Sequence, residues 1–301
     1  MEIRTQLHLH TTHSKGTRIT KESLISPREV VNLAVLHGIK AIAITDHNTT
    51  SAIPEVERYA KKRGIILIPG IEIDTFDGHL IGLGVNVGIE NSVRREMSAL
   101  EVADVIKDDG ALVYIPHPFD IRKKGIGTKI KEVDGLIEVF NPFNIFGFEN
   151  FYADYVATKL KRPKVVGGDV HVKSMFNVGI TVLDCEPTEE SILKALQKGK
   201  KRFENCRYMS LREMKEWSLE RVVQSYEDIK KSLLNGWEID TWYMKIANLK
   251  PLRKLQNFAL TLAEKKKSSR IWDFLTKFSY FLALIYAEKN KREFNEFVLS
   301  L

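Results

Sequence analysis

The sequence has little cysteine and no long apolar run, and both absences narrow the class of protein it can belong to. Its 301 residues include two cysteines, Cys185 and Cys206, which form neither a disulfide framework nor a metal-binding spacing. The longest apolar stretch, residues 278–287, is too short to cross a bilayer. No charged segment followed by an apolar one marks a leader at the N-terminus. We therefore expect a soluble cytoplasmic protein with no membrane partner.

An excess of charge of one sign is also missing from the first two thirds of the chain. Residues 1–200 hold 26 Lys and Arg against 26 Asp and Glu, so the formal net charge of +7 comes entirely from the last third. This asymmetry predicts a boundary near residue 205, with a first domain over 1–205 and a basic helical domain over 206–301. The lysines of the second domain can contact nucleic acid or an acidic partner. They do not alternate with aromatic residues, so a solvated helix surface is the simpler interpretation.

Hydrophobic patterning in the first domain alternates between strands and helices. The expected strands lie at residues 3–10, 39–45, 65–73, 79–85, 111–116, 135–140, 163–170 and 179–184. The expected helices lie near residues 26–38, 51–64, 92–109, 147–161 and 188–198. Strands that alternate with helices predict right-handed βαβ units and a parallel sheet. Seven or so such strands fit a closed barrel, in which functional groups collect at the C-terminal ends of the strands.

Six of the eight histidines and two carboxylates fall at strand ends or strand starts. They are His8, His10, His47, Glu72, His79, His117, Asp169 and His171. A single histidine in such a place is usually structural, but structural histidines have no reason to select the same end of every strand. Imidazole with carboxylate is the ligand set of zinc, manganese or iron. The set therefore predicts a site for more than one ion, able to generate hydroxide near neutral pH and to stabilise displacement at phosphorus.

Six ordered segments carry a resemblance to a known family. They are LHLHTTHSKG, AITDHNTT, IPGIEI, GHLIGLG, PHP and GGDVH. In this order they resemble the motifs of the PHP (polymerase and histidinol phosphatase) domain, over about residues 3–183. The resemblance implies a distorted seven-stranded α/β barrel, followed here by an all-helical C-terminal region. It also implies a metal-dependent phosphoesterase that acts on small phosphate esters, nucleotides or nucleic-acid ends.

By position, the resemblance assigns these eight side chains to two divalent ions and a third ion whose site is incomplete. The first ion would be bound by His8, His10, Glu72 and Asp169. The second would share Glu72 and add His79 and His117. The third would be bound by His47 and His171 with a carboxylate that follows the first histidine pair.

That third carboxylate is absent from the motif. Lys15 stands where many members carry aspartate, and no acid occurs between His10 and Glu22. Three interpretations stay open. Lys15 supplies the positive charge of the third ion and holds a substrate phosphate, His13 serves as a replacement ligand, or Lys15 faces solvent and the third site is weak. Gln6, in place of another common aspartate, would affect the support of the site rather than ligation.

The leading hypothesis is a hydrolase of phosphoric esters in which hydroxide held between the ions attacks phosphorus. His47 or His171 would position the phosphate or assist the leaving group, and Lys15 would contact it. Asp46 either orients a ligating imidazole or caps the turn after its strand. The alternative is a binding or regulatory module with structural metals, acting through its basic helical tail on nucleic acid or a protein partner. Retention of all six ligands of the two-ion core favours the enzyme.

Overall fold

The computed structural model describes residues 1–15, 21–122, 124–224 and 291–301. Of the basic helical domain predicted over 206–301, the structure describes residues 206–224 and 291–301. No helix within these four ranges is long and apolar enough to cross a membrane.

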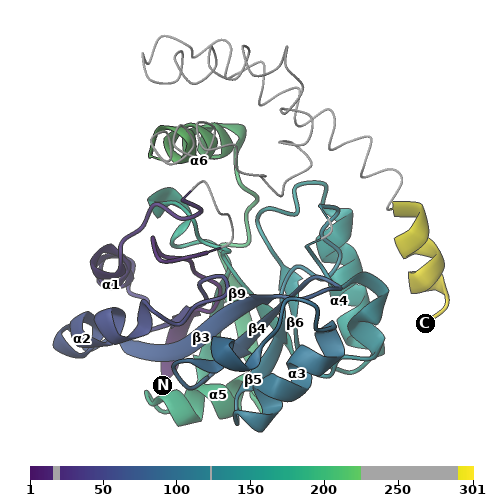
Figure 1. Ribbon diagram of the computed structural model, residues 1–301, viewed down its shortest axis with the longest axis horizontal. Coiled ribbons are helices and arrows are strands. Elements are labelled where there is room, and N and C mark those ends of the chain that lie inside the picture. The colour runs from purple at the N-terminus through teal and green to yellow at the C-terminus, as the bar shows by residue number, and fades with distance from the viewer. Residues whose placement is uncertain (16–20, 123, 225–290) are drawn as a thin grey trace.

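Nine strands form one curved sheet in the order β7-β6-β5-β4-β3-β2-β1-β8-β9 (Figure 1). The strands are β1 Glu2–Gln6, β2 Ala41–Ile44, β3 Ile66–Asp74, β4 His79–Leu83, β5 Leu112–Ile115, β6 Leu136–Phe140, β7 Lys164–Val166, β8 Ile180–Asp184 and β9 Lys201–Glu204. Strand β7 packs beside β8 and β9. The hydroxyl of Thr181 in β8 donates to the carbonyl of Val166 in β7 at 3.1 Å. The sheet is therefore a nearly closed α/β barrel.

Two predictions about this sheet were wrong, since its described part has nine strands rather than seven and is not all parallel. Strands β1, β2 and β3 pair in parallel, as do β5, β6 and β7. The pairs β3–β4, β4–β5, β1–β8 and β8–β9 are antiparallel. A tight turn closed by hydrogen bonds between Thr75 and Gly78, not a helix, separates β3 from β4. Runs of apolar residues do not encode strand direction, and β9 is too polar to appear as a buried strand.

The helices begin and end at local sequence signals. They are α1 Pro27–Leu36, α2 Ile53–Arg63, α3 Ala99–Asp108, α4 Phe148–Lys159, α5 Glu189–Lys198 and α6 Leu211–Gln224, with short 3₁₀ helices η1 Ile89–Ser92, η2 Gly127–Lys131 and η3 Lys173–Met175. A capping box of Ser26 and Glu29 starts α1. A second one, of Ser98 and Glu101, starts α3 several residues later than predicted. Residues 291–299 form a further helix that packs against the barrel through Phe294.

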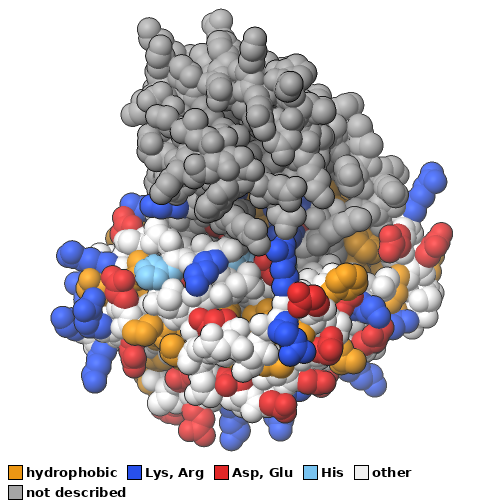
Figure 2. All heavy atoms as spheres, in the orientation of Figure 1, with side chains coloured by type: hydrophobic (Ala, Val, Ile, Leu, Met, Phe, Trp, Pro, Cys, Tyr) orange, Lys and Arg blue, Asp and Glu red, His pale blue; other side chains and the backbone are white. Residues whose placement is uncertain are grey.

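Apolar side chains fill the barrel and leave its polar groups at one end. One fully buried cluster contains side chains from several strands and from the residue after β1: Ile3, Leu7, Ile68, Ile81 and Leu183. Ile192 and Leu196 of α5 join this cluster. Figure 1 shows α5 below the sheet and α6 above the opposite end. One end is thus sealed by apolar contacts, and side-chain chemistry is possible only at the other. Acidic and basic side chains alternate over the visible face of the barrel (Figure 2), in keeping with its balanced charge.

Candidate metal centre

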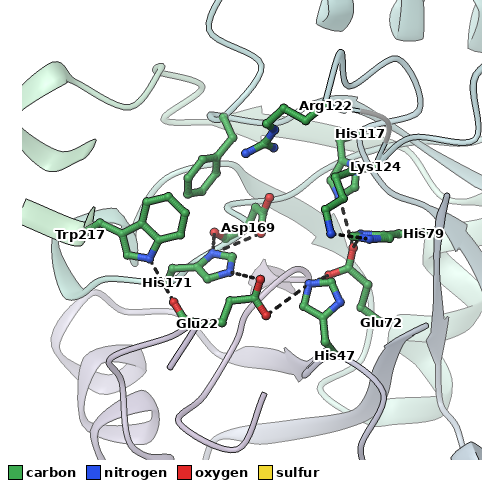
Figure 3. Close-up of a pocket in the computed structure, with 11 residues that line it drawn as sticks. Glu22, His47, Glu72, His79, His117, Arg122, Lys124, Asp169, His171 and Trp217 are labelled. Atoms are coloured by element: carbon green, nitrogen blue, oxygen red, sulfur yellow. Dashed lines mark hydrogen bonds and ion pairs between the residues drawn. The ribbon is translucent and has the colours of Figure 1, made fainter. Parts of the chain in front are cut away.

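All eight side chains singled out from the sequence meet in one buried cluster at the open end of the barrel. They are His8, His10, His47, Glu72, His79, His117, Asp169 and His171, and each is at most 6% exposed. Two short parallel bridges bring their segments together: Leu9 pairs with Val170, and His47 pairs with Glu72. Figure 3 shows six of these side chains pointing toward a common space. The eight residues, which were singled out because they fall at strand ends or strand starts, therefore lie at the same end of the barrel.

Four donor atoms surround one point at the spacing of a metal site. The Nε2 atoms of His8 and His10 lie 3.3 and 3.2 Å from Glu72 Oε2. The same two nitrogens lie 3.5 and 3.3 Å from Asp169 Oδ1. Donor atoms that bind one zinc ion at the usual length of about 2.0–2.1 Å lie about 3.3–3.4 Å apart. The spacing of these two imidazole nitrogens from both carboxylates therefore fits a divalent cation that the residues share.

An unpartnered buried nitrogen also fits a cation here. Within the described residues, the Nε2 atom of His10 is buried and makes no hydrogen bond. A buried ring nitrogen without a partner is costly in an apolar interior, and bonding to a metal removes that cost.

Glu72 faces a second group of donors with its other oxygen. Its Oε1 lies 2.8 Å from His79 Nδ1 and 3.2 Å from His117 Nε2, while its Oε2 faces His8 and His10. A carboxylate whose two oxygens face two separate sets of imidazoles has the geometry of a bridge between two ions. This arrangement matches the role that the family resemblance gave to Glu72.

Glu22 stands where the sequence showed no acid for a third site. Its two oxygens lie 3.6 Å from His47 Nε2 and 3.9 Å from His171 Nε2 (Figure 3). Burial opposes its ionisation, but the imidazoles of His47 and His171 lower the pKa of Glu22 to about 2. Sequence reasoning missed this residue because Glu22 follows His10 through a loop and not at a strand end. The first acid after the histidine pair was the available signal.

The two residues considered as substitutes for that acid lie elsewhere. The ring nitrogens of His13 lie 3.1 Å from Ser51 Oγ and 3.8 Å from Glu55 Oε2, on the outer side of the loop. Lys15 is exposed and lines a different cavity of about 290 Å³ with Asp74, Glu90 and other residues. The catalytic role predicted for Lys15 stays a prediction. The acid that faces both His47 and His171 is Glu22.

A buried carboxylate that sequence reasoning overlooked supports the cluster from below. Glu138 in β6 accepts a bond from Tyr114 Oη, and its Oε1 lies 3.0 Å from His8 Nδ1. Its Oε2 accepts bonds from the backbone N–H of His117 at 2.7 Å and from Asn141 Nδ2 at 2.9 Å. Such partners fix the orientation of a ligating imidazole and raise its basicity. Inside an apolar strand, Glu138 gave no signal of its own.

Asp46 and Gln6 hold backbone rather than imidazole. Asp46 accepts bonds from the N–H and the hydroxyl of Thr11, at 2.5 and 2.6 Å, and thereby fixes the chain that follows His10. Gln6 accepts a bond from the N–H of Gly168 at 3.0 Å and supports the loop that carries Asp169. Asp74, at the end of β3, is the acid that lies 3.0 Å from His47 Nδ1.

The charges of the cluster divide five of its histidines, His8, His10, His47, His79 and His171, into two groups. Burial acts to lower the pKa of each of these five, but nearby carboxylates outweigh burial at His8 and His10 and raise their pKa values. The pKa of His47 rises to about 10 through Glu22, Glu72 and Asp74, against the effect of burial. Burial dominates at His79 and His171, whose pKa values fall to about 4 and about 3. Without cations, the negative charge of the acids in the cluster is thus balanced by protons on His8, His10 and His47.

Three site positions adopt the left-handed backbone conformation that favours glycine. Asn48, His117 and Asp169 have φ angles of 52°, 27° and 45°. Each follows a strand closely, so the unusual turn directs its side chain across the end of the barrel. Backbone strain of this kind gathers where the surrounding structure requires a particular side-chain direction.

Basic and aromatic side chains surround the small cavity above the cluster. Arg122 is held by Asp120 through several hydrogen bonds, and Lys124 Nζ lies 3.3 Å from His79 Nε2. Phe143 and Trp217 form another part of the lining. The cavity measures about 50 Å³, room for a few water molecules at ~10–15 Å³ each, or for one phosphoryl group. The arrangement can hold a compact anion directly over the cations.

A nearly closed α/β barrel with a buried cluster of imidazoles and carboxylates at one end is typical of metal-dependent hydrolases. Comparison with known proteins makes this more specific. The sequence pattern of the PHP domain matches residues 6–236. The chain belongs to the PHP domain family, as its motifs predicted.

Individual relatives agree with this assignment. The chain is 33% identical over 153 residues to an uncharacterised protein of Methanocaldococcus jannaschii, a match that covers 49% of this chain and 87% of that protein. It is 34% identical over 126 residues to a 5'-3' exoribonuclease of Haemophilus influenzae, over 38% of this chain and 42% of the enzyme. The chain thus spans less than half of the exoribonuclease.

A crystal structure from Bacteroides vulgatus shares the fold. It is a two-domain protein described as containing a predicted PHP-like metal-dependent phosphoesterase. The TM-score is 0.57 at 16% sequence identity, over 74% of this chain and 70% of that one.

Proposed function

We propose that this chain is a metal-dependent phosphoesterase that removes or cleaves a phosphate ester at a small molecule, a nucleotide or a nucleic-acid end. The observation that carries the proposal is the close approach of His8 and His10 to the carboxylates of Glu72 and Asp169, with Glu72 extended toward a second group of imidazoles. Membership of the PHP domain family supports the same class of reaction.

The donor set is suited to zinc, manganese or iron. Two ions would be held by the six residues of the core and a third by Glu22, His47 and His171. When bound, such ions activate water as a nucleophile and stabilise negative charge on phosphoryl oxygens. The protein contributes a rigid frame, in which Glu138 orients His8 and Asp74 orients His47.

The rim of the cavity would bind the phosphate. Arg122 is fixed by Asp120, and this ion pair raises the pKa of the guanidinium further, so its charge is permanent. Lys124 adds a second positive charge beside His79. Charged donors fixed in advance bind phosphate oxygens strongly because little reorganisation is needed. The small volume favours a terminal phosphate, with the rest of the substrate outside the cavity.

The exoribonuclease relative supports a nucleotide or nucleic-acid end as the substrate. A module that keeps metals only for structure is the competing hypothesis, and it predicts ligands lost from the core. All six core ligands are instead present and converge. Residues 225–290, most of the basic tail that such a module would use, lie outside the described residues.

The test is turnover by protein loaded separately with Mn, Zn, Co, Fe or Mg. Substrates are phosphomonoesters, mononucleotides, and oligonucleotides phosphorylated at the 5' or the 3' end. We expect hydrolysis that Asp169→Asn abolishes and Asp104→Asn, on the exposed face of α3, leaves unchanged. An absence of turnover with every metal and substrate contradicts the proposal, as does turnover that survives Asp169→Asn.

A further inference from the structure

Helix α6 lies above the open end of the barrel, although its sequence falls in the domain that was predicted to be separate (Figure 1). Its start is fixed to the barrel. The N–H of Met209 donates to the carbonyl of Pro142 at 3.1 Å, and Arg207 donates to the carbonyl of Ser174 at 3.2 Å. Glu213 joins this anchor through a capping box with Ser210 and a two-bond pair with Arg207. The helix therefore has a defined position relative to the strand ends.

One turn further along, α6 binds the loop that carries Glu22. The indole Nε1 of Trp217 donates to the carbonyl of Glu22 at 3.0 Å (Figure 3). Nε of Arg221 donates to the carbonyl of Lys21 at 3.1 Å. The guanidinium of Arg221 also lies 4.5 Å from the centre of the Trp217 ring, so the two side chains act as one clamp on two consecutive carbonyls.

The same tryptophan encloses the imidazole that Glu22 faces. The Trp217 ring lies 5.4 Å from the ring of His171 and 5.2 Å from the ring of Phe143, edge to face in both cases. Phe143 and His171 are likewise 5.5 Å apart and edge to face. Three rings in mutual contact restrict the rotation of His171 and hold its Nε2 toward Glu22.

The barrel contacts this loop at Glu22 and beyond it. Ser23 Oγ donates to the carbonyl of His10 at 2.7 Å, and the N–H of Leu24 donates to the carbonyl of His171 at 3.1 Å. Ser14 Oγ donates to the Glu22 carboxylate at 3.2 Å. The carbonyls of Lys21 and Glu22 accept their bonds from α6. The helix therefore helps to set the backbone from which the Glu22 side chain projects.

We propose that α6 is a positioning element of the third cation site, in which Trp217 and Arg221 hold the loop at residues 21–22 so that Glu22 faces His47 and His171. The inference rests on the proposed metal-dependent function. It assigns the C-terminal region a share in the metal centre, so that a barrel ending near residue 205 would lack a complete third site. Trp217 and Arg221 touch neither the reacting atoms nor the cations and act through Glu22 and His171.

The experiment measures ions per chain and the affinity of each ion in the full-length protein. Co²⁺ is titrated against a competing chelator, and its absorption spectrum follows each equivalent. Trp217→Phe keeps an aromatic ring but removes the N–H donor, and Arg221→Gln removes the second bond. Arg212→Gln, a charge removal at an exposed site on the same helix, is the matched control. Glu22→Gln serves as the reference for a lost third site.

We expect three ions in the wild type and in Arg212→Gln. In Trp217→Phe and Arg221→Gln the third ion should bind at least 10-fold more weakly, in the range of ~10–100-fold known for residues that orient ligands. The first two ions should bind unchanged, which shows that the barrel is folded. The positioning role is overturned if Glu22→Gln loses the third ion while Trp217→Phe and Arg221→Gln both bind it with an affinity within twofold of wild type. A wild type that binds only two ions overturns the third site itself, while the two-ion phosphoesterase proposal stands.

Discussion

Replacement of Glu138 by glutamine tests how far the metal centre depends on a residue that touches no cation. The two Glu138 oxygens face four donors, from His8, Tyr114, His117 and Asn141. A glutamine has one oxygen and one NH₂ group in the same space. Turned one way, the NH₂ group faces two further donors, the N–H of His117 and the amide of Asn141. Turned the other way, it opposes the proton on His8 Nδ1, while the Tyr114 hydroxyl can accept from it.

The magnitude follows from this count. Each buried donor left without an acceptor costs about 1–3 kcal/mol, so one or two such donors lower the free energy of unfolding by about 1–6 kcal/mol. Because His8 loses the partner at its Nδ1, the affinity for the first ion should fall by ~10–100-fold, or about 1.4–2.7 kcal/mol.

Two measurements check the prediction. Urea unfolding of metal-free protein gives the change in stability, and competition with a chromophoric chelator gives the affinity for each ion. Glu132→Gln is the control, since this exposed glutamate pairs only with Lys129 at the surface and should change stability by no more than about 0.5 kcal/mol. If Glu138→Gln behaved like the control in both measurements, the support that we assign to Glu138 would be refuted.

Four further outcomes are expected. His47, with a pKa of about 10, keeps its proton at pH 8 and must release it to bind a cation. Calorimetry in buffers of different ionisation enthalpy should therefore show that His47→Gln releases about one proton fewer on metal binding than the wild type does. In metal-free protein this raised pKa stabilises the fold below pH 6.5, and the contribution is lost as the pH rises toward 10, so pH-dependent unfolding of wild type and His47→Gln should converge there. Gly167→Ala places a methyl group against Glu138 and only 2.6 Å from Tyr114 Oη, and should lower the free energy of unfolding by about 2–4 kcal/mol. An unchanged midpoint of urea unfolding contradicts the packing. Chelation should lower the thermal midpoint, because each ion at 100 times its Kd adds about 2.7 kcal/mol, and an equal midpoint with and without chelator argues against bound ions.

Local signals in the sequence predicted much of this structure. The helices predicted near residues 26–38 and 51–64 lie at Pro27–Leu36 and Ile53–Arg63, because helix ends are set by short-range signals such as the Ser26 cap and Gly64. The histidines at strand ends predicted a common site because strands that run the same way end at the same edge. That His8 and His10 share one face of their strand could be predicted from their spacing of two residues alone.

The remainder depends on contacts between distant parts of the chain. Strand direction after β3 follows from a tight turn, which an apolar pattern does not contain. Glu22 reaches the cluster through a loop held by another helix, and Glu138 is an acid inside an apolar strand. Trp217 looks like an ordinary member of an amphipathic helix until α6 is placed above the barrel. Such residues acquire their roles only when the chain is folded.

The left-handed turn at Asp169 implies a conflict between durability and activity. A glycine would adopt the φ angle of 45° without strain, and its use would relieve roughly 1 kcal/mol or more. It would also remove the carboxylate that faces His8, His10 and Asn141, whose pKa, well below its usual range, shows that the folded state stabilises its charge. Relief of the turn and loss of the carboxylate thus oppose each other in Asp169→Gly. A more comfortable backbone at this position would leave the cluster without one of its acids.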